Sequence, residues 1–315
     1  MCTFAARKML KKEMIFSVKI LLITIFVAVS CTERIDINTG DAPPRYVIYG
    51  HISSDTMQHS IRITRSAGYF TTDRPAGVSG AKVTISDIGD LESPMTLVEC
   101  DENAGLYLTA PDTYGIEGKT YILDVHIDYD DGRPSEHFQS MPAYLQKIHN
   151  IDTIGLRASA HFRYVVEVLL YAHNFGENNN YAIFVAINGS IVNSNLNRYM
   201  VINDSFFKGE TYIDGVECYF LNQNPYAEYR NEILRLNDTV TLKLNVISDE
   251  YARFISAAQS EIRGSNPIFG GPPANVPSNI LRKSPQNAPA PLGFFAAFPS
   301  RYAHTFVTEI FNFDR

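Results

Sequence analysis

The sequence predicts a mainly β protein: an N-terminal β-sandwich, followed by a second β-rich sandwich or barrel-like domain with one packed helix. Two observations support this fold class. Short segments of alternating apolar and polar residues recur along the chain, as in strands with one buried and one exposed face. Glycine-containing turns separate these segments at the short spacing that is typical of sandwiches.

A mainly apolar leader precedes the first predicted strand. Basic residues up to Lys19 are followed by the run 20–29, by Ser30 and by Cys31. This is the pattern of a secretory signal peptide that ends in a lipobox. We therefore predict that residues 1–30 are removed and that Cys31 carries diacylglycerol and palmitate, because several acyl chains anchor a protein stably to a membrane. The run is about half of the ~20 residues that a spanning helix needs.

Two alternatives to the lipid anchor remain, an uncleaved anchor and plain secretion. The chain starts at Met1 or at Met14, because the residues after Met14 already form a complete basic leader. The segment 31–44 is polar and ends in two prolines, which predicts an extended tether.

Length and charge restrict the possible partners. Removal of residues 1–30 leaves 285 residues, enough for two domains of about 100–200 residues each. These residues include 22 basic and 33 acidic side chains, a formal charge of −11, which argues against nucleic acid as a partner. Cys100 and Cys218 lie far apart in sequence; we expect buried free thiols there, with one disulfide as the alternative.

The first domain is predicted over residues 45–143. Its strands are expected at RYVIYGHI, HSIRITR, VSGAKVTISD, GLYL and GKTYILDV. In HSIRITR, Ile61 and Ile63 alternate with Arg62 and Thr64, so one face of the strand is expected to be buried. The dipeptide Asp131-Gly132 predicts a hairpin corner.

The second domain is predicted over residues 146–315. YVVEVLLY and YAIFVAI are apolar on both faces, which favours central strands. In VTLKLNVI, one face is apolar, while Thr241, Lys243 and Asn245 point the opposite way. PLGFFAAF and TFVTEIF are expected to supply the last strands.

A helix is predicted at about 249–263. Ser248 can cap it and Gly264 can end it. Its apolar residues fall on one stripe, which we expect to pack on a sheet: Tyr251, Phe254, Ile255, Ala258 and Ile262.

Two family resemblances add to these predictions. The order of VSGAKVTISD, GLYL and GKTYILDV resembles transthyretin-like and carboxypeptidase-regulatory-like domains, which implies an Ig-like sandwich with a structural or adhesive role. Nearly all of the mature chain resembles the Bacteroidota lipoprotein family catalogued as domain of unknown function 4249, most specifically at SNPIFGGPPANVPSNI and PLGFFAAF. This family has no established activity, and its likeness implies an accessory to a TonB-dependent outer-membrane transporter.

No pattern in the sequence names a reaction. Asp128, Asp130 and Asp131 precede Gly132 without the alternating spacing of a calcium loop, so a solvated hairpin tip is expected. No serine stands in a G-x-S-x-G elbow. The eight histidines contain no HExxH motif: His51, His59, His126, His137, His149, His161, His173 and His304. We therefore predict no catalytic, cofactor or metal site.

These observations lead to one functional hypothesis and one rival. The first is a non-enzymatic outer-membrane lipoprotein, anchored through Cys31 and able to face the cell surface, that assists a TonB-dependent transporter in nutrient capture. The rival is an adhesive or structural envelope protein without a transport role. The ligand is not identified by either hypothesis.

Overall fold

A computed structural model describes residues 44–66, 75–173, 179–203, 211–226, 230–264, 276–311 and 313. The predicted signal peptide, Cys31 and nearly all of the predicted tether lie outside the described residues. The chain from Pro43 to Arg315 forms one compact unit. None of the helices among the described residues is both long and apolar enough to cross a membrane. The predicted mainly β fold class is confirmed.

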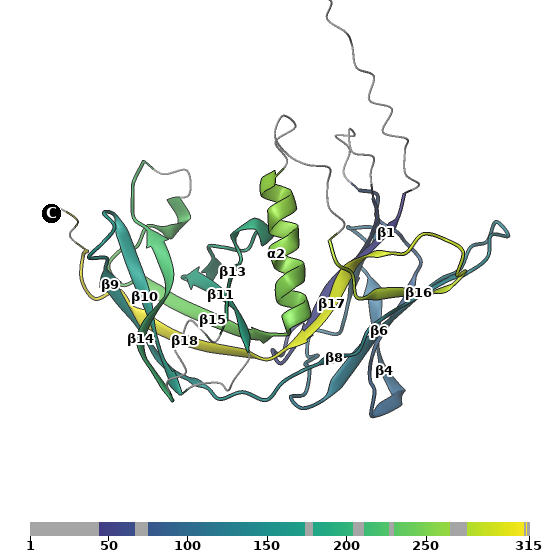
Figure 1. Cartoon of the computed structure of the whole chain (residues 1–315), viewed down its shortest axis with the longest axis horizontal. Helices are drawn as coiled ribbons and strands as arrows, with labels where there is room; N and C mark the ends of the chain where they lie inside the picture. The colour runs from purple at the N-terminus through teal and green to yellow at the C-terminus, as the bar shows by residue number, and fades with distance from the viewer. Residues whose placement is uncertain are drawn as a thin grey trace, which may run out of the picture. The chain divides into compact units, whose positions relative to one another are not determined.

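The first sheet has ten strands among the described residues (Figure 1). Nine of them form one continuous path of paired strands, the first sheet path. Its strand order is β16-β7-β6-β3-β4-β5-β2-β1-β17, with β8 paired to β6. The strands are β1 (Tyr46–Ser53), β2 (Ser60–Arg65), β3 (Lys82–Asp87), β4 (Asp90–Glu99), β5 (Leu106–Leu108), β6 (Thr120–Ile127), β7 (Glu136–Ser140), β8 (Ala143–Tyr144), β16 (Ile280–Ser284) and β17 (Leu292–Phe298).

The path folds into a sandwich around an apolar core. Ile61 and Ile63 of β2 are fully buried, as their alternation predicted. They pack in one cluster with Val83 and Ile85 of β3 and with Phe138 of β7. In β1, β2, β3 and β6, alternate residues therefore face the core, while the intervening residues form the outer faces of the sandwich.

Two strands from the C-terminal part complete this sandwich. β17 pairs in parallel with β1, and β16 pairs with β7 in antiparallel orientation. Asn279, just before β16, connects the two ends of the path: its Nδ2 donates to the Phe295 carbonyl at 2.7 Å, and its Oδ1 accepts from the Phe295 amide at 2.9 Å. PLGFFAAF was expected to be a strand of the second domain, but here it lies in the first sheet path. The predicted domain boundaries otherwise stay predictions.

Two smaller sheets form the remaining β structure of the described chain. One has the order β14-β10-β9, and the other has the order β12-β11-β15-β18 with β13 paired to β11. Their strands are β9 (Ile151–Ala158), β10 (Val165–His173), β11 (Asn180–Ile187), β12 (Ser190–Ile191), β13 (Met200–Asn203), β14 (Tyr212–Asn222), β15 (Thr239–Ile247) and β18 (Ser300–Phe306). Short 3-10 turns occur at η1 (Leu196–Arg198) and η3 (Arg230–Glu232).

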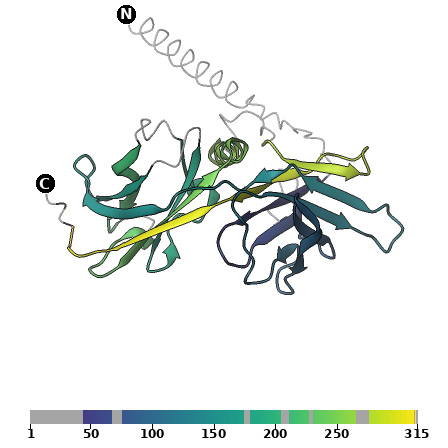
Figure 2. The same ribbon diagram turned by 90° about the horizontal axis from the view of Figure 1, so that it is seen from below.

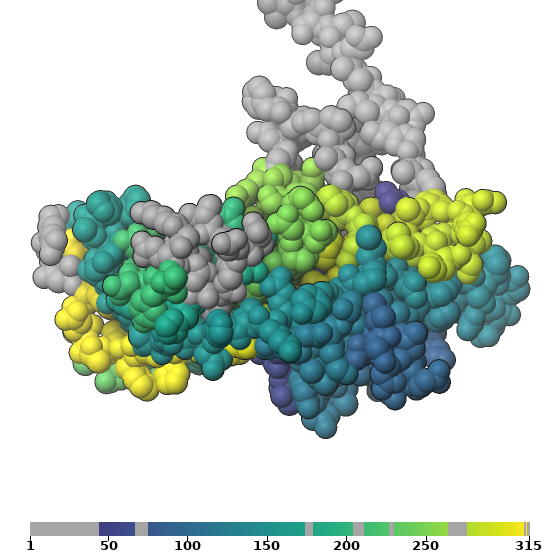
Figure 3. Space-filling view, turned by 60° about the horizontal axis from the view of Figure 1, so that its bottom comes forward, coloured from purple at the N-terminus to yellow at the C-terminus, as the bar shows by residue number. Residues whose placement is uncertain are grey.

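The two smaller sheets share a core. Val168 and Leu170 of β10 pack with Ile183 of β11 and with Leu242 and Leu244 of β15. The predicted central strands β10 and β11 are indeed central, each with neighbours on both sides, although they belong to different sheets. β17 and β18 form one long ribbon that joins the first sheet path to β15 (Figure 2). In the space-filling view, residues near the C-terminus accordingly lie at the surface in two places, beside the first sheet path and beside the two smaller sheets (Figure 3).

The predicted helix is α2 (Asp249–Gly264). Ser248 caps it, because its Oγ accepts from the Tyr251 amide at 3.2 Å. Tyr251, Phe254 and Ile255 are buried and pack against residues of β11 and β17. Ile262 was predicted to continue this apolar stripe, but it is exposed in the last turn.

The predicted strands differ from the structure in two ways: several strands, among them β4, β9, β14 and β16, were not predicted, and the last strand was placed too late in the chain. β4 was not predicted, because most of its residues are exposed and show no apolar alternation. The final strand was expected at TFVTEIF, yet β18 ends at Phe306. β18 pairs with β15 through the preceding SRYAHTF segment. Its buried residues, Ser300 and Ala303, are small and three positions apart, so the segment shows no apolar alternation.

Gly293 tests the parallel pairing of β1 with β17. Its φ is +106°, and a Cβ there would lie 2.0 Å from the Ile48 carbonyl oxygen. We expect Gly293→Ala to lower the free energy of unfolding by about 3 kcal/mol, measured by urea denaturation. Gly80→Ala is the control, because Gly80 also has a positive φ but no atom within 4 Å of a new Cβ; a cost of about 1 kcal/mol is expected there. Equal costs would contradict the close approach.

Candidate functional site

A cavity of about 280 Å³ lies where α2 meets the outer faces of the two layered structures. β1 contributes Tyr49 and His51, β15 contributes Lys243 and Asn245, and α2 contributes Tyr251, among other lining residues. Each strand turns its alternate residues away from its own core at this place. The site therefore exists because two sheets with separate cores present their outer faces to the same helix.

Aromatic rings form the walls of the cavity. Tyr251 stacks on Phe298 with ring centroids 6.1 Å apart and an interplanar angle of 9°. The Tyr49 and Tyr251 hydroxyls share a hydrogen bond of 2.8 Å. Phe184 and Tyr199, which also line the cavity, meet edge to face with ring centroids 4.7 Å apart. Such rings offer a large apolar surface together with a few hydroxyl groups.

Lys243 and Arg62 are charged residues that line the cavity, and Lys243 has a carboxylate partner. Lys243 Nζ lies 2.6 Å from Asp55 Oδ2, and both of these side chains are largely buried. Burial by itself lowers the pKa of Lys243, but the bond with Asp55 outweighs it and leaves the pKa above its ordinary value. Burial likewise raises the pKa of Asp55, and the bond with Lys243 more than reverses this effect. Both groups are therefore charged near neutral pH and compensate each other.

Two histidines lie beside this ion pair. His51 stacks on Phe298 with ring centroids 4.9 Å apart. Burial, together with the nearby His59 and Lys243, lowers the pKa of His51 to about 4. Burial also lowers the pKa of His59, whose Nε2 lies 3.2 Å from the Asp55 carbonyl oxygen. Both imidazoles are therefore neutral at pH 7.

The tyrosine hydroxyls of the cavity also stay neutral. Burial raises the pKa of Tyr49 and, together with Tyr49 itself, raises the pKa of Tyr251 well above the ordinary value. Burial and Tyr49 raise the pKa of Tyr199 to about 12. None of these shifted groups is moved toward pH 7, where general acids and bases work best. The arrangement is thus suited to holding a molecule by contact and hydrogen bonds.

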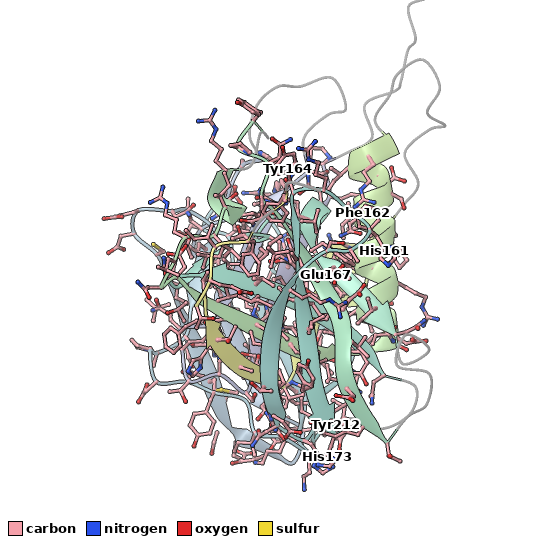
Figure 4. All side chains as sticks on the ribbon, turned by 90° about the vertical axis from the view of Figure 1, so that its left-hand side faces the viewer. His161, Phe162, Tyr164, Glu167, His173 and Tyr212 are labelled. Carbon is pink, nitrogen blue, oxygen red and sulfur yellow. The ribbon has the colours of Figure 1, made fainter. Side chains whose placement is uncertain are left out.

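A second surface lies on the outer face of the β9, β10 and β14 sheet (Figure 4). The Glu167 carboxylate is buried and accepts from Arg157, whose guanidinium also contacts Glu217 at 2.6 Å. Burial raises the pKa of Glu167, and hydrogen bonds and Arg157 more than reverse this. Near it, Phe162 and Phe220 are 60% and 39% exposed and meet edge to face at 6.4 Å.

Three residues on the outer face of the first sandwich could hold a metal ion. Asp124, His126 and His137 offer ligand atoms that all lie within 4.8 Å of one another. The sequence predicts no metal site, because these residues lack a recognised motif. Their approach depends on the pairing of β6 with β7.

The other residues singled out from the sequence are the cysteines and the acidic residues of the hairpin tip. Cys31 lies outside the described residues. Cys100 and Cys218 are free thiols; Cys218 is buried as expected, whereas Cys100 is half-buried. The expected hairpin tip is confirmed by the pairing of β6 with β7. Asp131 at this tip is exposed and binds Arg133 at 2.8 Å.

Sequence reasoning missed most of the cavity. It placed Lys243 and Asn245 on the outer face of their strand, which is where they line the cavity. It gave no means of bringing them to Tyr49 and His51, almost two hundred residues earlier. The alternation in YVIYGHI does turn Tyr49 and His51 to one face, and this was the available signal.

Comparison with known protein families shows which family the chain belongs to. The profile described as "Domain of unknown function (DUF4249)" matches residues 32–301. The chain belongs to this family. The DUF4249 match covers every strand of the first sandwich and all the residues named as lining the cavity. The resemblance noted in the sequence is therefore confirmed for the family.

Solved structures and curated proteins add little about this DUF4249 member. The crystal structure of chicken CNTN1 FN1–FN3 domains is 14% identical, with a TM-score of 0.25, over 64% of this chain and 60% of that chain. A marsupial T cell receptor is 10% identical, with a TM-score of 0.20, over 64% of this chain and 90% of that chain. The comparison with curated proteins gave no match.

His51 gives the cavity a pH dependence. Between pH 6.5 and 4 the unfolded chain binds a proton at His51, while the folded chain does not. The free energy of unfolding therefore falls as the pH falls through this window, by on the order of 2–3 kcal/mol. We expect His51→Phe, which keeps a ring against Phe298, to flatten the profile measured by urea denaturation, with a smaller slope left from His59. Superimposable profiles of the two proteins would contradict this account.

Proposed function

We propose that this DUF4249 protein is a non-enzymatic, lipid-anchored binding protein of the outer membrane that captures a small, uncharged and partly aromatic ligand. We further propose that it serves as an accessory to a TonB-dependent transporter. The aromatic cavity beside α2 is the observation that carries the proposal.

The size and lining of the cavity support a small ligand. Its volume of about 280 Å³ lies near the lower end of the ~300–1,000 Å³ range of ligand pockets. It is almost twice the ~150 Å³ cavity that accepts benzene. Tyr49, Tyr199 and Tyr251 offer ring faces and hydroxyl groups, so a compact bicyclic molecule with one polar group fits the chemistry.

The electrostatics of the cavity support an uncharged ligand and a role without catalysis. Lys243 is already compensated by Asp55 at 2.6 Å, and His51 is neutral at pH 7 because burial lowers its pKa to about 4. A charged ligand would lose its hydration without gaining a free counter-charge from Lys243 or His51. Arg62 also lines the cavity, where its guanidinium is exposed to solvent and donates to Asn103 Oδ1 at 2.6 Å. The same pKa shifts move the groups away from the range that suits proton transfer at neutral pH.

The anchor and the partner are proposed from the sequence and from the family resemblance. The lipobox-like pattern at Cys31 supports lipidation with palmitate, and the polar segment 31–44 supports a tether. The resemblance to Bacteroidota lipoproteins supports a place in the outer membrane beside a transporter. A cavity protein tethered there would present its ligand to the barrel.

Calorimetry with 2-naphthol tests the cavity. We expect saturable 1:1 binding, and we expect Ile191→Trp to weaken it tenfold or more, because Ile191 lines the cavity while 43% exposed and a larger ring would fill the entrance. Ile88→Trp is the matched control, since Ile88 is 44% exposed in a turn of the first sandwich. Absence of saturable binding, or equal affinity in the two variants, would count against the cavity as a binding site.

Affinity purification from gently solubilised outer membranes tests the anchor and the partner. We expect the tagged protein to carry acyl chains on Cys31 and to bring a transporter barrel with it in stoichiometric amounts, as shown by mass spectrometry. Cys31→Ala should release the protein from the membrane fraction. A lipidated protein that comes out alone would favour the rival role.

The rival role is adhesion or envelope structure. The exposed pair Phe162 and Phe220 favours it, because exposed aromatic residues are enriched at contact surfaces. Deletion of the protein would then alter attachment or envelope integrity and leave nutrient uptake unchanged.

A further inference from the structure

The hairpin of β6 and β7 carries three metal-binding side chains on its solvent side. Asp124 and His126 alternate with buried Val125, so both project from the outer face of the sandwich. His137 on β7 lies directly opposite His126 in the antiparallel register, and Gln139 lies opposite Asp124. Strand pairing therefore places the two imidazoles and the carboxylate on neighbouring positions of a rigid surface.

The three side chains are already in contact. The His126 and His137 rings stack with centroids 3.9 Å apart and an interplanar angle of 15°. His137 Nε2 lies 2.9 Å from Asp124 Oδ1. All three ligand atoms lie within 4.8 Å of one another, whereas donors around a tetrahedral ion with ~2.0–2.1 Å bonds sit about 3.3 Å apart. Small side-chain rotations would bring the set to that spacing.

The charges around the cluster favour a bound cation. Neutral imidazole is the form that binds metals. Asp124 and Asp128 supply negative charge, while Lys82 opposes it from β3. The two carboxylates beside the imidazoles thus outnumber the one lysine.

We propose that Asp124, His126 and His137 form a binding site for a divalent transition-metal ion of the zinc class. Two imidazole nitrogens and one carboxylate oxygen match the donors that Zn²⁺, Ni²⁺ and Cu²⁺ prefer. His126 is exposed and the other two residues are half-buried, so the ion can enter from solvent and keep a coordination position for water.

Gln139 supports this site as a positioning residue. Its Nε2 donates to Asp124 Oδ1 at 3.1 Å and approaches Oδ2 at 3.4 Å. The amide therefore holds the carboxylate in place whether or not a metal is bound. Loss of such an outer contact typically weakens metal binding 10- to 100-fold.

Isothermal titration of the purified, chelator-treated protein with Zn²⁺ tests the site. We expect one saturable equivalent, weakened more than tenfold in His126→Ala and in His137→Ala and about tenfold in Gln139→Ala. His304→Ala is the matched control, because His304 is an exposed strand histidine on β18, and it should bind as the wild type does.

A second readout separates binding from misfolding. Zn²⁺ should raise the Tm of the wild type and of His304→Ala, and it should leave the Tm of His126→Ala unchanged, with all three proteins cooperative in thermal unfolding without metal. No saturable binding by the wild type, or equal binding by wild type and both histidine variants, would overturn the proposal. Neither result depends on whether the aromatic cavity binds a ligand.

Discussion

The burial of β17 on both faces is the constraint on which the rest of the described structure depends. Phe295 and Ala297 point into the core of the first sandwich, while Phe294, Ala296 and Phe298 face α2. The strand is also held along its edge by parallel pairing with β1. Exposing it would therefore cost two apolar interfaces and a set of backbone hydrogen bonds together. The helix, the first sandwich and the second set of sheets meet through this one segment.

The cavity follows from the same arrangement. A helix is a cylinder, and it cannot fill the angle between two sheets that belong to different cores. Aromatic residues line the remaining space together with Lys243, which forms an ion pair with Asp55. Tyr49 hydrogen-bonds to Tyr251 across more than two hundred residues of sequence. The site thus joins segments that are distant in the chain, which is why no local motif announces it.

Sequence alone predicted most elements and few of their long-range partners. The alternation around Ile61 and Ile63 correctly predicted a strand, and the apolar stripe of α2 correctly predicted a helix, because both patterns are local. β4 escaped prediction because its side chains are mostly exposed. The pairing of β17 with β1 could not be foreseen, since periodicity carries no information about which strands become neighbours. The predicted hairpin corner at Asp131-Gly132 did imply that His126 and His137 lie opposite each other, because both are five residues from the corner.

The late position of β16 and β17 in the chain bears on the order in which the protein can fold. β1 is synthesised first, yet its parallel neighbour begins at Leu292. Contacts between segments so far apart form slowly, since a long loop must close before they are gained. Until then the nascent β1 has an unpaired edge, which is a template for aggregation. A protein built in this way should depend on chaperones that hold the unfolded chain until β16 and β17 have been synthesised.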